Sequence, residues 1–580
     1  MSTASSSLRA ALLLAGLSAC AAHPASVTPA PSGPTSGIAP TWTYAGKARV
    51  AEGTHGMVVS GSPLASEVGR KILEEGGNAI DAATAVGFAL AVVHPEAGNI
   101  GGGGFSIIRT ADGKVTALDY RETAPAAATR TMYQDLEGDP TELSITGILG
   151  VGVPGSVAGL VEQHRKYGRL PLRDIVAPAI ALARDGFTVD AYRERSIDAS
   201  RPLLYLFNGS RADFLPDGHA PKVGTTFRQP DLARTLEMIA DSGANGFYRG
   251  PVADLLVAEM QRDGGLITHA DLEQYRAIWR DPIAIEYRGY TVYSMPPSSS
   301  GGVTLAEILN VMEGFGPLPP FGSPQLIHRE AEAMRRAFTD RNYYLGDPDY
   351  VNAPIAKLIS KAYADSLRTS IDLEHATPSA VVKPAAGGMS TTHYSVVDAD
   401  GNAVSTTTTL NNSYGSGVTV TGAGFLLNDE MDDFASAPGK PNMYGLVQGD
   451  VNAVAPGRRM LSAMTPSVVT DSAGKLFLVV GTPGGPTIIT QVYHVISNVI
   501  DHHMSLADAV AAPRMHHQGL PDQIRLEAGG FYPATIAALE AMGHAIVFRT
   551  RWGDVEAIIR TPTGWEGVSD PRLGGGGAGY

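Results

Sequence analysis

Thr391 is the residue of this sequence best suited to covalent chemistry. Residues 376–389 are rich in Pro, Ser, Ala and Gly, and a strand-like alternating run begins directly after Thr391. A threonine at such a join suits a chain that is cut to expose a new N-terminus. The freed α-amino group could then serve as the base that a threonine hydroxyl needs at neutral pH. The same pattern is also typical of a linker followed by an ordinary strand.

The elements that would position Thr391 alternate between helices and strands. Apolar residues with helical spacing predict helices over residues 64–75, 79–93, 490–500 and 505–512. Alternating patterns predict strands over residues 105–109, 115–120, 394–397, 403–410, 467–470 and 476–481. Residues 160–260 have mostly helical patterns, so we expect them to form an appended lobe.

A set of short segments resembles the γ-glutamyltransferases, which are N-terminal nucleophile hydrolases. The segments follow the family's order along residues 50–580, and no single one is decisive. They are 75–82 (EGGNAIDA), 94–99 (HPEAGN), 101–105 (GGGGF), 119–125 (DYRETAP), 152–156 (GVPGS), 293–302 (YSMPPSSSGG), 391–395 (TTHYS), 428–434 (NDEMDDF), 481–485 (GTPGG) and 569–572 (SDPR).

The resemblance implies a fold and a division of the chain. The fold is α/β, a four-layer α/β/β/α sandwich of the N-terminal nucleophile hydrolase type, with the helical lobe appended. Cleavage between Ser390 and Thr391 would give a large subunit of residues 46–390 and a small subunit of residues 391–580, which remain together as a heterodimer.

The resemblance also implies a two-step acyl transfer that needs no cofactor and no metal. Thr391 would attack the γ-amide carbonyl of glutathione or another γ-glutamyl compound and pass the glutamyl group to water, an amino acid or a dipeptide. Thr409 would support the nucleophile through its hydroxyl. Gly484 and Gly485 would donate backbone N–H groups to the oxyanion, although a Pro-Gly-Gly run alone is more typical of a tight turn.

Recognition of an α-amino acid end needs charges of both signs. By resemblance, Arg121 and Ser462 would contact the α-carboxylate, while Glu430, Asp433 and Asn411 would surround the α-ammonium. Arginine suits a carboxylate because its planar fork can form two parallel hydrogen bonds. Without the resemblance, Arg121 would be interpreted as a surface ion pair and the acidic run as a solvated loop.

Three features near these residues affect the expected pocket. Ala463 follows Ser462 where the family often has a second serine, so one carboxylate hydrogen bond is expected to be missing. Pro486-Thr487 also differs from some relatives and could alter the pocket wall. Residues 438–449, with Tyr444, have the length and composition of the family's lid loop, although an ordinary surface loop would look alike.

The N-terminus predicts export. Residues 1–20 contain a short apolar run and end in Leu-Ser-Ala-Cys, which resembles a bacterial lipoprotein signal with Cys20 as the lipidated residue. Residues 21–45 are expected to be a flexible tether. We therefore expect a periplasmic protein that is lipid-anchored to the outer membrane, and the alternative is a cleaved signal with an incidental cysteine.

Composition narrows the remaining possibilities. Cys20 is the only cysteine, so an intrachain disulfide or a cysteine-based metal site is excluded. A net charge of −14 argues against a nucleic acid partner. Two alternatives to a γ-glutamyltransferase remain, a cephalosporin (glutaryl) acylase of the same superfamily and a non-catalytic lipoprotein that binds glutamyl peptides. Arg121 with Glu430 and Asp433 favours an α-amino acid substrate, and the presence of Thr391 favours catalysis.

Overall fold

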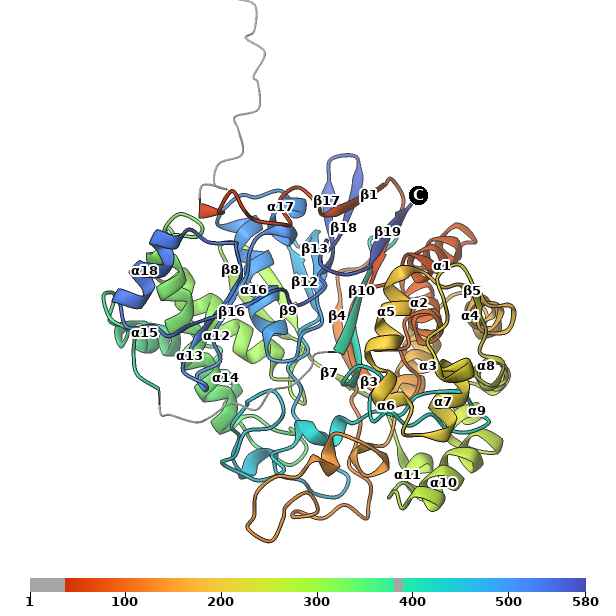
Figure 1. Cartoon of the computed structure of the whole chain (residues 1–580). Helices are drawn as coiled ribbons and strands as arrows, with labels where there is room; N and C mark the ends of the chain where they lie inside the picture. Colours follow the sequence, from red (N-terminus) through yellow and green to blue (C-terminus); the bar gives the residue numbers. More distant parts are fainter. Residues whose placement is uncertain (1–36, 380–389) are drawn as a thin grey trace, which may run out of the picture.

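Two antiparallel sheets of seven strands lie face to face at the centre of the computed structural model, which describes residues 37–379 and 390–580 (Figure 1). The sheet that carries Thr391 contains, in spatial order, β19 (Gly576–Gly579), β2 (Met57–Ser60), β10 (Ser390–Val397), β11 (Ala403–Asn411), β3 (Gly103–Arg109), β4 (Val115–Tyr120) and β7 (Ile278–Arg280). The second sheet contains β1 (Arg49–Gly53), β18 (Gly564–Ser569), β17 (Glu556–Thr561), β13 (Leu476–Gly481), β12 (Ser467–Thr470), β9 (Tyr290–Ser294) and β8 (Ile283–Tyr287).

Strands that are buried on both faces explain the layered arrangement. In β3, Ile107 points into the core between the two sheets, whereas Ile108 points into the core beneath the helices. Neighbouring residues of a strand face opposite sides, so a continuous apolar run can serve two cores at once. The inter-sheet core joins Phe105 and Ile107 of one sheet to Val468 and Val479 of the other.

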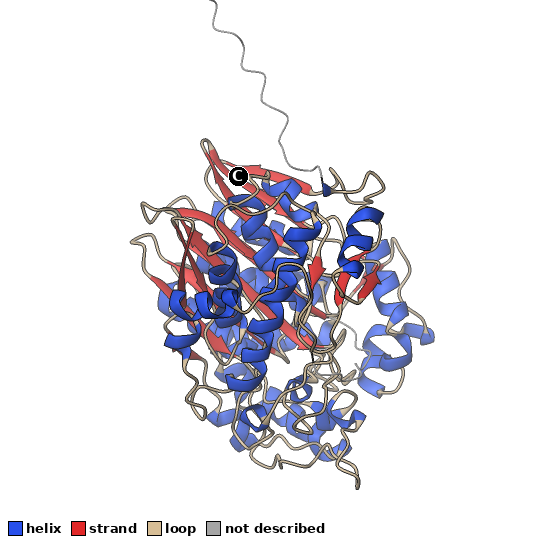
Figure 2. Ribbon diagram, turned by 90° about the vertical axis from the view of Figure 1, so that its left-hand side faces the viewer, coloured by secondary structure: helices blue, strands red, loops and turns tan. Residues whose placement is uncertain are grey.

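Helices cover the outer face of each sheet. The Thr391 sheet packs against α1 (Pro63–Glu74), α2 (Ala79–Val93) and α3 (Ser156–Tyr167). The second sheet packs against α12 (Gly301–Glu313) and α16 (Thr487–Ile500), and α13 (Pro324–Tyr344) packs on α12. Figure 2, viewed from the side of the second group, shows helices crossing in front of the strands. The predicted α/β/β/α sandwich is confirmed.

The predicted helical lobe is also confirmed, and it contributes to the core beneath α2. Its helices are α4 (Leu172–Asp185), α5 (Ala191–Ala199), α6 (Arg201–Leu204), α7 (Asn208–Phe214), α8 (Pro230–Ser242), α9 (Asn245–Tyr248), α10 (Pro251–Asp263) and α11 (His269–Gln274). The smaller elements are β5 (Phe187–Thr188), β6 (Thr226–Phe227), α14 (Ile355–Leu358), α15 (Lys361–Thr369), α17 (Leu506–Ala511), β14 (Met515–His516), β15 (Ile524–Glu527), α18 (Pro533–Ala541) and β16 (Ile546–Arg549).

The expected tether ends earlier than residue 45. The backbone N–H of Ala39 donates to the carbonyl of Gly530 at 3.0 Å, and the indole N–H of Trp42 donates to the carbonyl of Ala511 at 2.8 Å. Trp42 is 5% exposed, so burial of its ring fixes this stretch against the body of the protein. Residues 21–36 of the expected tether, and Cys20, lie outside the described residues.

None of the helices in residues 37–379 and 390–580 combines the length and the apolar content needed to span a lipid bilayer.

Candidate active site

Thr391 lies near the start of β10, where that strand pairs with β11. The register places Thr391 opposite Thr409, with an irregularity between Ser390 and Thr391. The Thr391 hydroxyl donates to the Thr409 hydroxyl at 3.3 Å, and Thr409 Oγ1 also accepts from the backbone N–H of Asn411 at 2.8 Å. The expected supporting residue therefore contacts the expected nucleophile through a long hydrogen bond. Residues 380–389, which precede the expected cleavage site, are not among the described residues.

Two hollows meet at Thr391. We call the first the inner pocket; its free volume is about 20 Å³. Its lining residues are Arg341, Thr391, Thr409, Asn411, Glu430, Asp433, Tyr444, Leu446, Ser462, Ala463, Met464, Gly485, Pro486 and Ile488. We call the second the outer cavity; its volume is about 730 Å³, and its wall includes Thr391 and Gly484. Thr391 therefore borders two spaces of very different size.

Gly484 and Gly485, the glycines expected to stabilise the oxyanion, lie on different hollows. Gly484 lines the outer cavity, and Gly485 lines the inner pocket. Gly484 and Gly485 connect β13 to α16 with φ angles of +141° and +55°, both in the region that favours glycine. A Cβ atom on Gly485 would lie 3.0 Å from two ring carbons of Tyr444. The carbonyl groups of both glycines accept hydrogen bonds from the first turn of α16, which anchors the turn. Hydrogen bonds to α16 therefore fix the turn, and its two glycines have no side chains that would fill the space beside Thr391.

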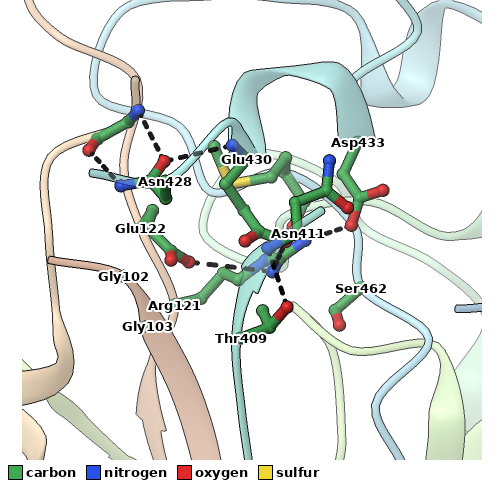
Figure 3. A network of polar contacts seen from close by, with 12 residues as sticks. Gly102, Gly103, Arg121, Glu122, Thr409, Asn411, Asn428, Glu430, Asp433 and Ser462 are labelled. Atoms are coloured by element: carbon green, nitrogen blue, oxygen red, sulfur yellow. Dashed lines mark hydrogen bonds and ion pairs between the residues drawn. The ribbon is translucent and has the colours of Figure 1, made fainter. Parts of the chain in front are cut away.

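Arg121 forms the centre of a buried charge network (Figure 3). Its guanidinium pairs with the carboxylates of Glu430 and Asp433, and its Nε donates to the carbonyl of Met460 at 3.2 Å. Burial lowers the pKa of Arg121, but the carboxylates of Glu430 and Asp433 more than offset this effect and raise its pKa above the usual range. Burial raises the pKa of Glu122, whose carboxylate lies 3.7 Å from Arg121, to about 7.

This network adds a contact that the sequence-based picture did not include. The sequence assigned Arg121 and the two acidic residues to opposite ends of a bound amino acid, yet in the structure they contact one another. Arg121 is fully buried and does not line the inner pocket, whereas Glu430 and Asp433 do. The physical reason is that opposite charges removed from water are stable only when they are paired.

Arg341 is a pocket residue that the sequence analysis missed. It is 1% exposed, and it donates to Ser300 Oγ at 3.0 Å and to Asn342 Oδ1 at 2.9 Å. Within residues 37–379 and 390–580, no carboxylate lies within ion-pair distance of it. Burial lowers its pKa to about 10. The helical spacing of Ala333, Ala337 and Arg341 places this charge on the apolar face of α13, and that spacing was the available signal.

The remaining expected residues close the inner pocket. Ser462 Oγ accepts from the backbone N–H of Met464 at 3.1 Å, and the adjacent Ala463 offers only a methyl group. The Tyr444 hydroxyl donates to Asn411 Oδ1 at 2.6 Å, and Tyr444 is 9% exposed. Tyr444, in the loop expected to be a lid, therefore lines the inner pocket.

One group outside the pocket has metal-ligand geometry. It comprises His328, Glu332 and His544. The two imidazoles hydrogen-bond to each other at 2.8 Å, while the carboxylate of Glu332 is bonded to Arg335, Arg336 and Thr377. Two adjacent guanidinium groups oppose a cation, so this group is better described as a buried polar network.

Comparison with known proteins agrees with the geometry of the site. The gamma-glutamyltranspeptidase family model matches residues 65–580. The chain belongs to the gamma-glutamyltranspeptidase family.

Relatives of this gamma-glutamyltranspeptidase family member carry two kinds of name. The chain is 48% identical over 525 residues to a glutathione hydrolase proenzyme of Escherichia coli, covering 89% of this chain and 90% of the relative. It is 39% identical over 525 residues to the acylase ACY 1 proenzyme of a Pseudomonas species, covering 89% and 91%. The crystal structure of a cephalosporin acylase from Bacillus halodurans has a TM-score of 0.81 and 30% identity, covering 92% and 97%.

Proposed function

We propose that this protein is a self-cleaving γ-glutamyltransferase and glutathione hydrolase. The observation that carries the proposal is the position of Thr391. Its hydroxyl contacts Thr409, and the residue borders both the charged inner pocket and the larger outer cavity. Membership of the gamma-glutamyltranspeptidase family and 48% identity to a glutathione hydrolase proenzyme support it.

Maturation would begin with an attack by Thr391 Oγ on the carbonyl carbon of Ser390. The Ser390–Thr391 C–N bond breaks as the C–O bond forms, and the resulting ester is hydrolysed by water. The products are a Ser390 carboxylate and a free α-amino group on Thr391, which supplies the base for catalysis.

Turnover would use the same hydroxyl. The α-amine accepts the proton of Thr391 Oγ, which attacks the γ-carbonyl carbon of the donor. The N–H groups of Gly484 and Gly485 stabilise the tetrahedral oxyanion, and the leaving amine departs with the proton. Water or another amine then attacks the γ-glutamyl ester and restores the free hydroxyl.

Recognition of the γ-glutamyl group would exploit the buried charges. A donor ammonium contacts the carboxylates of Glu430 and Asp433 together with Asn411, while the donor carboxylate contacts Ser462 and the guanidinium groups of Arg121 and Arg341. Binding would replace part of the internal pairing of Arg121 with pairing to the donor, which keeps each buried charge compensated. A donor that lacks either charge would leave a protein charge without its partner.

The deciding experiment is incubation of the purified full-length chain, followed by a denaturing gel and a glutathione hydrolysis assay. We expect a fragment of about 20 kDa, the share of 60.6 kDa carried by residues 391–580, and release of glutamate. An intact chain without hydrolysis would reject the proposal.

A side-chain acylase is the second possible function, favoured by the similarity to proteins named as acylases. The matched test compares glutathione with a glutaryl amide. A preference for the glutaryl amide would support the acylase. The carboxylates of Glu430, which is buried, and Asp433, which is partly buried, argue for glutathione.

We also propose attachment through a lipidated Cys20 to the periplasmic leaflet of the outer membrane. The support is the sequence of residues 17–20, with Ala21 rather than Asp after the cysteine. Metabolic labelling with a fatty acid analogue should mark the wild-type chain and not Cys20→Ser. An unlabelled wild-type protein would reject lipidation.

A further inference from the structure

One buried side-chain amide packs against the turn that contains Gly484 and Gly485. It belongs to Gln491, which lies on α16 one helical turn after Thr487 and is fully buried. A side-chain amide has two N–H donors and one acceptor oxygen, and leaving these groups without partners in the interior would cost free energy. The hydrogen bonds of Gln491 therefore show which part of the chain it holds in place.

The amide of Gln491 bonds to residues on both sides of the glycine pair. Its Nε2 donates to the carbonyl of Pro483 at 3.2 Å and to Thr487 Oγ1 at 2.9 Å. The Thr487 hydroxyl in turn donates to the carbonyl of Gly484 at 2.7 Å. The Oε1 atom of Gln491 accepts from Thr482 Oγ1 at 3.1 Å. One side chain therefore joins the end of the turn that follows β13 to the end that begins α16.

The same amide fits between two glycines. A Cβ atom on Gly484 would lie 2.7 Å from Gln491 Nε2, and a Cβ atom on Gly553 would lie 1.7 Å from Gln491 Oε1. Both distances are shorter than a van der Waals contact, so a larger residue at either position would displace the amide. Gln491 is therefore held against the turn by close packing as well as by hydrogen bonds.

These contacts set the direction of the two N–H groups expected to stabilise the oxyanion. The carbonyl of Pro483 and the N–H of Gly484 belong to one planar peptide unit, and the carbonyl of Gly484 and the N–H of Gly485 belong to the next. In a trans peptide unit the two groups point in opposite directions, so a side chain that binds the carbonyl also orients the N–H. Gln491 binds the first carbonyl directly, and Thr487, which Gln491 contacts, binds the second.

We propose that Gln491 is a positioning residue for the reaction, which directs the N–H groups of Gly484 and Gly485 toward the oxyanion that forms beside Thr391. The inference rests on the proposed function. Glycine has the widest choice of backbone conformations, so two consecutive glycines do not select this orientation by themselves. The negative charge on the oxygen develops only in the transition state. A change at Gln491 should therefore slow the reaction without weakening the binding of the donor.

The test compares Gln491→Met with Asn498→Leu, using a chromogenic γ-glutamyl anilide as the donor and counting mature protein from the small-subunit fragment on a gel. Gln491→Met should lower kcat at least ~10-fold while the donor KM changes less than about twofold. Asn498→Leu is the matched control, because it also removes a buried amide from α16, two helical turns further along, where Asn498 Nδ2 donates to the carbonyl of Ala509 at 3.4 Å. It should keep the wild-type kcat.

Thr487→Val is a second and smaller change. It removes the hydroxyl that links Gln491 to the second peptide unit, so kcat should fall about threefold. If Gln491→Met yields no mature protein, Thr487→Val decides the question, and an unchanged kcat in that variant overturns the inference. A wild-type kcat in mature Gln491→Met, or an equal loss of kcat in Asn498→Leu, would overturn this inference alone. Wild-type protein that consumes no γ-glutamyl donor would overturn the proposed function together with it.

Discussion

The inner pocket and the outer cavity share Thr391 but differ in volume and in the exposure of their arginines. The inner pocket has a free volume of about 20 Å³, and its carboxylates Glu430 and Asp433 are paired with the fully buried Arg121. The outer cavity is about 730 Å³, and its arginines Arg195 and Arg551 are exposed.

The contrast indicates where the protein can be selective. A buried charge left unpaired costs several kcal/mol, so the inner pocket should reject any donor that lacks one charge. An exposed charge contributes about 0.2–1 kcal/mol to binding. The outer cavity should therefore accept many amines and discriminate between them only weakly. One nucleophile would thus combine a strict donor site with a permissive acceptor site.

Removal of the shared hydroxyl should abolish the function of both sites. Thr391→Ala should leave a single uncut chain with no transfer, because the variant has neither the attacking oxygen nor a freed N-terminus. A denaturing gel after purification checks this. Thr391→Ser should still be cut, more slowly, and efficient cleavage of the alanine variant without protease would contradict the mechanism.

Loss of the donor ammonium should have the next largest effect. We expect at least ~100-fold lower kcat/KM for a glutaryl analogue of glutathione that lacks only the α-amine, or about 2.7 kcal/mol. Steady-state kinetics with both donors checks this. Equal rates would remove the contrast between the two sites and favour the acylase.

Arg121→Lys should weaken donor binding through geometry rather than charge. Lysine keeps the cation but loses the planar fork that contacts Glu430 and Asp433, so the donor KM should rise at least ~10-fold while cleavage continues. Initial rates across a range of glutathione concentrations, together with a gel, separate these effects. An unchanged KM would exclude Arg121 from donor recognition.

Arg341→Lys should have a smaller effect of the same kind. Arg341 lines the inner pocket without an ion-pair partner among the described residues, and lysine retains its charge, so we expect a rise in donor KM of about fivefold. Thermal unfolding of the same sample shows whether the α13 packing is intact. An unchanged donor KM in a stably folded variant would reduce Arg341 to a structural role.

Ala463→Ser should give the smallest change, and in the favourable direction. The added hydroxyl would supply a neutral hydrogen bond to the donor carboxylate worth ~0.5–1.5 kcal/mol, so the donor KM should fall about threefold. The KM for the acceptor should stay near the wild-type value. A larger effect on the acceptor than on the donor would mean that Ala463 does not lie on the donor side.

The sequence by itself determined the main helices and strands and identified most of the residues that line the inner pocket. The predicted strands at residues 115–120, 467–470 and 476–481 match β4, β12 and β13, because successive strand residues face opposite sides of a sheet and this period can be read locally from the sequence. Asn78 caps helix α2, since its side chain accepts from the backbone N–H groups of Ile80 and Asp81. Local spacing and capping residues carry this information.

The tertiary structure decided which charged residues pair and where the two cavities lie. No sequence pattern shows that Arg121 contacts Glu430 and Asp433, which follow it by more than 300 residues, or that Arg341 on α13 faces the same pocket. The outer cavity likewise arises only where helix α5 faces residues 551–554. Charge compensation and cavity volume depend on distances between elements, and those distances are fixed by packing of the cores rather than by local spacing along the chain.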